Sequence, residues 1–356
     1  MDVTSLLGKE LTWGRHKLVA LLVVLVLLPA VFSYTTFAFQ HVLPTDAPVA
    51  VAPADDATTE EDLDIATASV TLFSDPRTYD SEAAAMRALN RERVYAVIAV
   101  PPDLTDESAG TAHFDVYASG SVVPYLQPSQ ALASIASYTL EDQLPRDVSA
   151  TRHVVGEEYA LSSYLIPAFL LTLVSLVALV YLPYTFDQEA AVLDRLRVET
   201  SLHAVVASKL AFFGALLFVP LAVFDATTAH AGAALSVLTP GTALVTLLTF
   251  LLLGLVAATL MVVFRFGTWG RIANLLVMLF VLSFSGIAYP VGFFSPARRW
   301  LVRHVPTHYS AVTTRGFVLR GDAVGQYADW LLGLAAWVVG AAVVFAGAVE
   351  LYERRA

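Results

Sequence analysis

Six long apolar stretches divide the chain, and segments rich in polar residues separate them. A helix needs about 20 mostly apolar residues to cross the hydrocarbon core of a bilayer, and each stretch meets that requirement. The pattern therefore predicts six transmembrane helices, with one large polar segment between the first and the second. The predicted spans are residues 18–39, 161–184, 205–224, 242–264, 272–291 and 330–349.

The polar segment, residues 40–160, carries its own pattern of secondary structure. Residues 41–64 are rich in Pro, Ala and acidic residues, which predicts a solvated linker. The remainder predicts a compact β-α-β-β-α domain of about 80 residues. Its expected strands are 69–73, 94–100 and 113–119, and its expected helices are 81–91, with Ser81 as N-cap, and 128–144.

Composition excludes a soluble globular protein. Hydrophobic residues make up 57% of the chain and charged residues 15%, whereas soluble domains carry about 25% charged residues. The polar segment holds 20 of the 31 acidic residues but only 6 of the 21 basic ones, so an acidic domain is joined to a mildly basic membrane region. No basic patch suits a nucleic acid, and none is expected as a partner. The absence of cysteine excludes disulfides, thiolate nucleophiles and cysteine zinc sites.

The basic residues predict how the chain lies in the membrane. Lys and Arg concentrate in the segments that are cytoplasmic if the N-terminus is inside. We therefore expect a multi-pass protein of the cell membrane with both termini in the cytoplasm and the acidic domain outside. The first stretch is longer than a signal-peptide core and lacks a cleavage site, which predicts an uncleaved anchor. Residues 292–329 are an exception, since they would place five arginines outside; we expect these to face lipid head groups rather than an anionic substrate.

The sequence lacks motifs for nucleotide binding, metal binding or ion coupling. The three lysines are followed by Glu10, Leu18 and Leu210, so no phosphate loop ending in Gly-Lys-Ser/Thr exists in the chain. His304 and His308 have metal spacing, but Pro306 lies between them and no carboxylate is near, so no metal site is expected. Ionisable residues lie only near the ends of the spans, which disfavours ion coupling. We expect no enzyme and no cofactor in this chain, and an energy source in a partner.

One predicted cytoplasmic segment, residues 186–200, is amphipathic. Its apolar residues Val192, Leu193 and Leu196 recur at helical spacing, and charged residues fill the other positions: Glu189, Asp194, Arg195, Arg197 and Glu199. A helix of this kind either transmits force from a soluble partner or simply connects two spans along the membrane surface. The pattern alone leaves both alternatives open.

Three stretches of the chain together resemble the permeases of ABC-2 type transporters. Residues 187–200, followed by Ala207-Ser208-Lys209, resemble the coupling segment of that family, although Ala190-Ala191 and Ser201 depart from its usual pattern. Residues 89–105 resemble a stretch of the subgroup with a large outer domain. The late series that resembles the family signature is Ser285-Gly286, Pro290, Pro306 and Arg315.

The resemblance implies a fold and a function. The fold is an α-helical polytopic membrane protein with an N-terminal segment 1–39, an extracytoplasmic α/β domain 40–160 and a five-helix domain 161–356, which includes the coupling helix 186–200 and an outer re-entrant segment 292–329. The function is that of an ATP-driven exporter subunit that pairs with a second permease subunit and docks an ATP-binding subunit. The alternative is a membrane receptor or scaffold that transports nothing and whose outer domain binds a ligand. The implied coupling residues are Glu189, Leu193, Asp194, Arg195, Leu196, Arg197 and Glu199, and the implied bend or gate residues are Gly286, Pro290 and Pro306.

Overall fold

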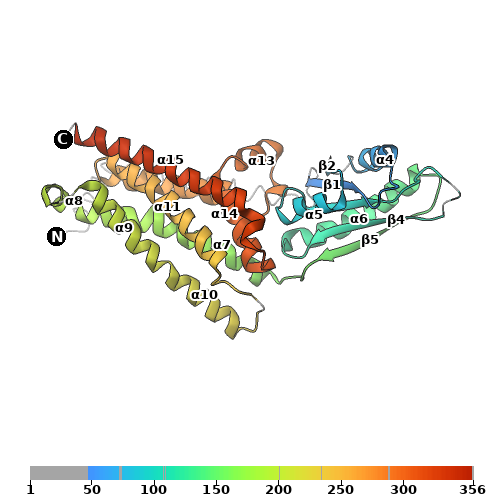
Figure 1. The fold of residues 1–356 in the computed structure, drawn as a ribbon, viewed down its shortest axis with the longest axis horizontal. Helices are drawn as coiled ribbons and strands as arrows, with labels where there is room; N and C mark the ends of the chain where they lie inside the picture. Colours follow the sequence, from blue (N-terminus) through green and yellow to red (C-terminus); the bar gives the residue numbers. More distant parts are fainter. Residues whose placement is uncertain are drawn as a thin grey trace, which may run out of the picture.

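The computed structural model describes residues 47–71, 74–106, 108, 110–199, 201–233, 235–287 and 289–354. A helical bundle fills one half of the molecule and an α/β domain the other (Figure 1). The C-terminus lies at the end of the bundle farthest from the α/β domain. The predicted span 18–39 lies outside the described residues.

The α/β domain is one five-stranded sheet with the strand order β2-β1-β3-β4-β5. The β1–β2, β1–β3 and β4–β5 pairs are parallel, and β3–β4 is antiparallel. Strand β3 is buried along its whole length, and the main core of the domain gathers around it. In chain order the elements are β1 (Ala47–Pro53), α4 (Glu60–Val70), β2 (Ser74–Thr78), α5 (Glu82–Asn90), β3 (Ala96–Val100), β4 (Ala112–Ser119), α6 (Val123–Gln143) and β5 (Val148–Val155).

The expected linker at 41–64 is wrong for residues 47–53, which form a strand, and for residues 60–64, which begin a helix. Residues 47–53 form β1, although prolines disfavour a strand with neighbours on both sides. Pro48 has no N–H to donate, but its carbonyl accepts a hydrogen bond from the Tyr95 backbone N–H at 2.9 Å. The acidic residues that suggest a solvated linker instead begin helix α4, where negative charge is favourable beside the helix N-terminus.

Helix α4 begins with a capping box. The Thr59 side chain accepts from the backbone N–H of Asp62, and the Asp62 carboxylate accepts from the Thr59 backbone N–H at 2.9 Å. The same carboxylate accepts from the Leu104 backbone N–H at 2.9 Å, which ties the helix to the chain after β3. Ser69 and Val70 end this helix, so a strand over 69–73 is wrong for these two residues, and β2 begins at Ser74. Strand β5 is a further element that the sequence pattern does not predict.

Four helical runs are long and apolar enough to cross a membrane: Leu161–Ala190, Leu202–His230, Pro240–Val263 and Val324–Glu353. They coincide with four of the predicted spans. The helix in the fifth predicted span, 272–291, is shorter, because it runs from Thr268 to Phe284 and stops before Gly286. In chain order the bundle contains α7 (Leu161–Leu176), the π-helical turn η4 (Val177–Tyr181), α8 (Leu182–Glu199), α9 (Leu202–Leu216), α10 (Phe218–His230), α11 (Pro240–Val263), α12 (Thr268–Phe284), η5 (Val291–Phe293), α13 (Pro296–Val302), α14 (Pro306–Arg315), η6 (Gly316–Arg320), η7 (Val324–Tyr327) and α15 (Ala328–Glu353).

Candidate functional site

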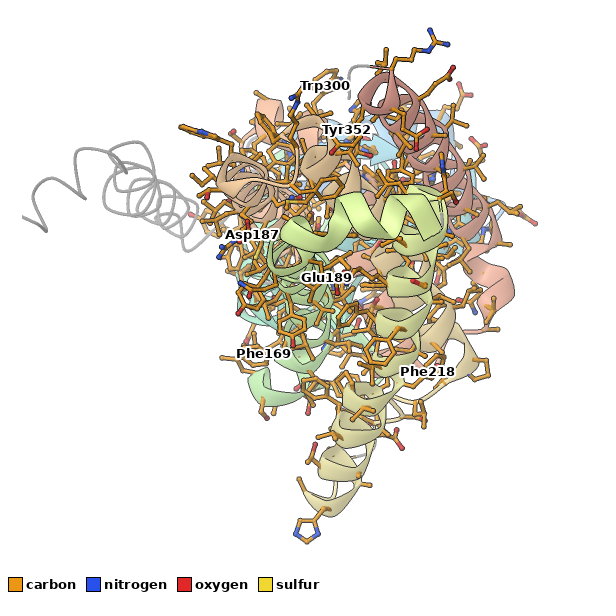
Figure 2. All side chains as sticks on the ribbon, turned by 90° about the vertical axis from the view of Figure 1, so that its left-hand side faces the viewer. Phe169, Asp187, Glu189, Phe218, Trp300 and Tyr352 are labelled. Atoms are coloured by element: carbon orange, nitrogen blue, oxygen red, sulfur yellow. The ribbon has the colours of Figure 1, made fainter. Side chains whose placement is uncertain are left out.

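Helix α8 forms the end of the bundle that lies away from the α/β domain (Figures 1 and 2). It continues from α7 through the π-helical turn η4 without a break in the helix. Single π-helical turns inside longer helices occur frequently at functional sites. The segment 186–199 is therefore the terminal portion of a long helix rather than a separate helix between two loops.

A lysine from α9 holds the predicted coupling residue Glu189. The Lys209 ammonium donates to the Glu189 carboxylate at 2.7 Å and lies 5.5 Å from the centre of the Phe186 ring. Only 14% of the Lys209 side chain is exposed, compared with 40% of Glu189. The family-like pair Glu189 and Lys209, separated by 20 positions in the sequence, is thus in direct contact.

A second ion pair ties α8 to α12. Arg271 donates to Asp187 at 3.0 Å and lies 5.5 Å from the centre of the Tyr184 ring. Ser201 stands where the family pattern has proline and caps α9, because its hydroxyl accepts from the Ala204 backbone N–H at 3.2 Å. The other predicted coupling residues lie on the helical backbone of α8, but their side chains are outside the described portion of the chain: Leu193, Asp194, Arg195, Leu196, Arg197 and Glu199.

The predicted bend residues lie after the C-terminal end of α12. Gly286 has a φ of +65°, a conformation that glycine adopts at little cost, and a Cβ there would lie 2.6 Å from the Val291 side chain. Pro290 precedes the short turn η5, and Pro306 is the first residue of α14. The chain therefore leaves α12 through a tight turn and returns as the two short helices α13 and α14.

Arg315 joins this turn to the α/β domain. Its guanidinium donates to the carbonyl oxygens of Gly286 at 3.0 Å and Ile287 at 3.2 Å. It also forms a bidentate pair with Glu92, at 2.8 and 2.6 Å, and only 2% and 1% of the two side chains are exposed. Burial alone would raise the pKa of the Glu92 carboxyl, but the charge and hydrogen bonds of Arg315 hold that pKa below its ordinary value.

Two more arginines form hydrogen bonds between the domain and the bundle. Arg320 donates to the Asn90 carbonyl at 2.9 Å and to the Ser121 hydroxyl at 2.8 Å. Arg91 forms a bidentate pair with Asp329, at 3.1 and 2.9 Å. The expectation that the arginines of 292–329 face lipid head groups is therefore wrong for Arg315 and Arg320, which bind the α/β domain.

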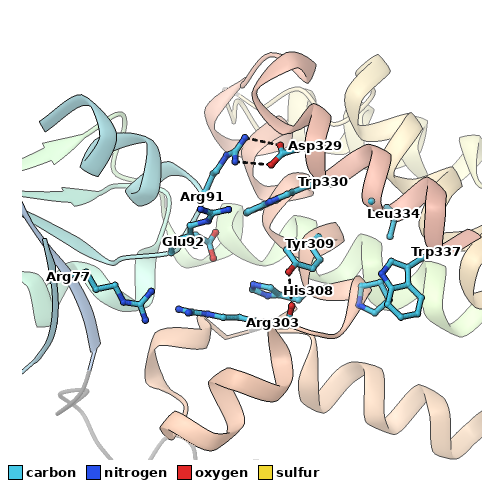
Figure 3. A pocket seen from close by; sticks show the side chains of 13 residues that line it. Arg77, Arg91, Glu92, Arg303, His308, Tyr309, Asp329, Trp330, Leu334 and Trp337 are labelled. Carbon is cyan, nitrogen blue, oxygen red and sulfur yellow. Dashed lines mark hydrogen bonds and ion pairs between the residues drawn. The ribbon is translucent and has the colours of Figure 1, made fainter. Parts of the chain in front are cut away.

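A cavity of about 550 Å³ lies beside this contact. Figure 3 shows Arg77, Arg91 and Arg303 at the end that faces the α/β domain, with Leu334 and Trp337 of α15 at the other end. Charged groups and apolar groups thus occupy opposite ends of one pocket.

A comparison with known protein families decides what kind of protein this is. The model of the family described as ABC-2 family transporter protein matches residues 18–346, which is most of the chain. The chain belongs to the ABC-2 family of transporter proteins. No curated protein and no solved structure gives a significant match.

Family membership confirms the permease that the sequence motifs predict. This permease is a multi-pass membrane protein with apolar helices and an N-terminal α/β region. Permeases of this family are generally the transmembrane component of a transporter rather than its catalytic component, and they imply an ATP-binding subunit.

Sequence patterns did not predict Glu92 and Arg315 as site residues, although they fix the α/β domain to the membrane bundle. Arg315 appears in the sequence only as a member of the family signature, while Glu92 stands in the short charged run Arg91-Glu92-Arg93 after a helix. Such a run normally predicts solvent exposure. Glu92 is nevertheless buried, because it pairs with Arg315, which lies 223 positions away in the sequence. No local pattern reveals such a partner.

Proposed function

We propose that this chain is the permease subunit of an ATP-driven exporter. Two permease subunits, identical or related, form the transmembrane pathway and line it with their second and fifth spans. A separate ATP-binding subunit supplies the energy, and this chain needs no cofactor of its own. The proposal includes six spans, both termini in the cytoplasm and a location in the cell membrane.

The position of α8 carries the proposal. It closes the end of the bundle opposite the α/β domain (Figure 1), which is the end that a cytoplasmic ATPase reaches if the α/β domain is outside. Ion pairs from Glu189 and Asp187 tie it to α9 and α12. Since α8 also continues α7, a force on its terminal half would reach three membrane helices together.

Closure of the two ATPases would displace the terminal half of α8 and change the tilt of α7, α9 and α12. The outer ends of these helices respond differently, because α12 ends at the Gly286 turn, which Arg315 holds against the α/β domain. Helix motion at the inner end would therefore open the pathway at the outer end, where the chain bends at Gly286 and Pro290.

The test begins with purification of the chain from native membranes in mild detergent, followed by measurement of ATP hydrolysis. We expect an ATP-binding subunit to co-purify with vanadate-sensitive activity. A chain without such a partner, under conditions that keep other transporters of this kind intact, would contradict the proposal and favour a receptor or scaffold.

Variants in α8 sharpen this test. Arg195→Ala should leave insertion intact and uncouple hydrolysis from transport, because it removes a charged group from the proposed docking surface. Glu353→Ala is the matched control, since Glu353 is an exposed charge on α15, at the end of the bundle that carries the C-terminus. Equal transport by both variants would exclude α8 as the coupling segment.

A further inference from the structure

The cavity between the α/β domain and α15 has an unusual charge distribution. Four arginines line it, together with two carboxylates, Glu92 and Asp329. Both carboxylates are already engaged, Glu92 by Arg315 and Asp329 by Arg91. Arg77 pairs with Asp75 at 3.4 Å. The lining therefore carries more positive than negative charge, and the carboxylates cannot neutralise it further.

Two of the arginines have no carboxylate partner among the described residues. Arg93 lies over the face of Trp330, with its guanidinium 5.9 Å from the ring centre, and Arg91 lies over the same ring at 5.2 Å. Arg303 is half-buried, and no described acceptor binds its guanidinium. Burial and the nearby charge of Arg77 lower the pKa of Arg303, and the charge of Asp75 offsets this only in part. A positive group that is partly removed from water and has no hydrogen-bonded counter-ion is energetically costly, and an anion in the cavity would offset that cost.

The other end of the cavity is apolar and lies on one face of α15. Trp330, Gly333, Leu334 and Trp337 follow helical spacing, and all four line the cavity. No heavy atom lies within 4 Å of the position that a Cβ on Gly333 would take, so the space beside this glycine is open. We call the part of the cavity at Gly333, between Trp330 and Trp337, the groove. Tryptophan is enriched at the level of lipid head groups, which is the level at which the phosphate of a bound lipid would lie.

The size of the cavity fits a small ligand. Pockets for small molecules have volumes of about 300–1,000 Å³ and combine apolar walls with a few polar groups that fix the orientation. The volume of about 550 Å³ lies within this range. Arginine binds phosphate through two parallel hydrogen bonds, which makes it well suited to a phosphate ester.

We propose that this cavity binds an anionic phospholipid from the outer leaflet, with its phosphate between Arg93 and Arg303 and an acyl chain in the groove at Gly333. The inference goes beyond the export function and does not depend on ATP coupling. A bound lipid would bridge the α/β domain and α15 and would add a contact to those made by Arg91 and Arg315.

The experiment compares lipids that differ in one property. Purified, delipidated protein is titrated with phosphatidylglycerol or with phosphatidylcholine of the same acyl chains, and bound lipid is counted by native mass spectrometry. We expect phosphatidylglycerol to bind more tightly by about tenfold, since it lacks the choline cation that repels the arginines. Equal affinity for both lipids, or binding of neither, would overturn the proposal.

Charge variants locate the head group. Arg93→Gln and Arg303→Gln should each weaken phosphatidylglycerol binding by roughly tenfold, the expected effect of losing one charge-assisted hydrogen bond. Arg87→Gln is the matched control, because Arg87 is an exposed arginine of α5 outside the cavity. Unchanged affinity in both cavity variants would overturn the assignment of the phosphate.

Glycine variants locate the acyl chain. Gly333→Leu should fill the groove and reduce lipid binding, while Gly340→Leu, one heptad further along the same helix and also without a neighbour within 4 Å, should not. Glycerol phosphate serves as a competitor without an acyl chain. Displacement of the lipid at similar concentrations of glycerol phosphate would show a site for free phosphate esters and would exclude the lipid.

Discussion

The two ends of the membrane bundle are held by different kinds of ion pair. At the end that contacts the α/β domain, Glu92 and Arg315 are almost completely buried and share two short hydrogen bonds. At the opposite end, Glu189 and Asp187 bind Lys209 and Arg271 through single contacts, and Glu189 is 40% exposed.

This difference indicates that the Glu92–Arg315 end is a rigid connection, whereas the α8 end can move. A buried pair is strongly destabilising to break, because it leaves an unpaired charge without water. A pair in which one partner is partly exposed contributes less, since water can reach and solvate that partner. The α/β domain and the turn at Gly286 should therefore move as one body, while α8 can shift with a bound partner at small cost.

The largest effect is expected from breaking the buried pair. Glu92→Gln should lower the free energy of unfolding by about 3–5 kcal/mol, because Arg315 would remain charged and buried. Thermal unfolding in detergent measures the change, and the amount of protein in the membrane reports a failure to fold. The double change Glu92→Met with Arg315→Met should be less destabilising than Glu92→Gln.

A matched control comes from the surface of the same domain. Asp115 pairs with His153 at 2.7 Å, and both side chains are nearly half exposed. Asp115→Asn should cost less than about 1 kcal/mol. If the two single variants unfold at the same temperature, the buried pair does not hold the domain in place.

Low pH should weaken the Glu92–Arg315 pair. The pKa of Glu92 is lowered from its ordinary value of 4.5 in the folded protein, so the folded state binds a proton less readily than the unfolded state. The stability that Glu92 contributes is then complete above about pH 4.5 and is lost as the pH falls through the lowered pKa. Between about pH 5 and 8 this group should cause no change in unfolding temperature. Glu92→Gln should lack the acid-dependent contribution, and an identical pH profile in the variant would assign that contribution to other groups.

A smaller effect is expected where Tyr95 packs on Gly292. A Cβ on residue 292 would lie 2.4 Å from the Tyr95 ring, so Gly292→Ala should cost about 1–3 kcal/mol through overpacking. Gly325→Ala is the control in the same segment, 292–329, since nothing lies within 4 Å of its Cβ position. Equal unfolding temperatures for the two variants would show that the domain does not press on this turn.

The smallest effect on stability is expected at the other end. Lys209→Ala should change the free energy of unfolding by only about 0.2–1 kcal/mol, because its partner Glu189 is partly exposed. The same variant should reduce the ATP hydrolysis that is coupled to transport, since α8 would no longer move with α9. Glu350→Ala, which breaks an exposed pair with Arg354, should change neither quantity. A large loss of stability in Lys209→Ala would make this end a second rigid connection.

Sequence patterns predicted the elements that depend on local chemistry. Helix α5 begins after Ser81 as expected, because the hydroxyl accepts from the Ala84 backbone N–H. Four long apolar helices were visible from hydropathy alone. Strand β1 was missed, because its two prolines argue against a central strand and only the neighbouring strands β2 and β3 show that it is one.

The sequence by itself determined that this protein lies in a membrane, that it has an acidic domain before its long apolar helices, and that it resembles ABC-2 permeases. Each of these follows from composition, periodicity or motifs, which act over short distances along the chain. Only the tertiary structure decided that Glu92 meets Arg315, that Glu189 meets Lys209, and that arginines and tryptophans share one cavity. Contacts between residues far apart in the sequence depend on how whole elements pack, and the energy of a charged side chain depends on the burial that this packing creates.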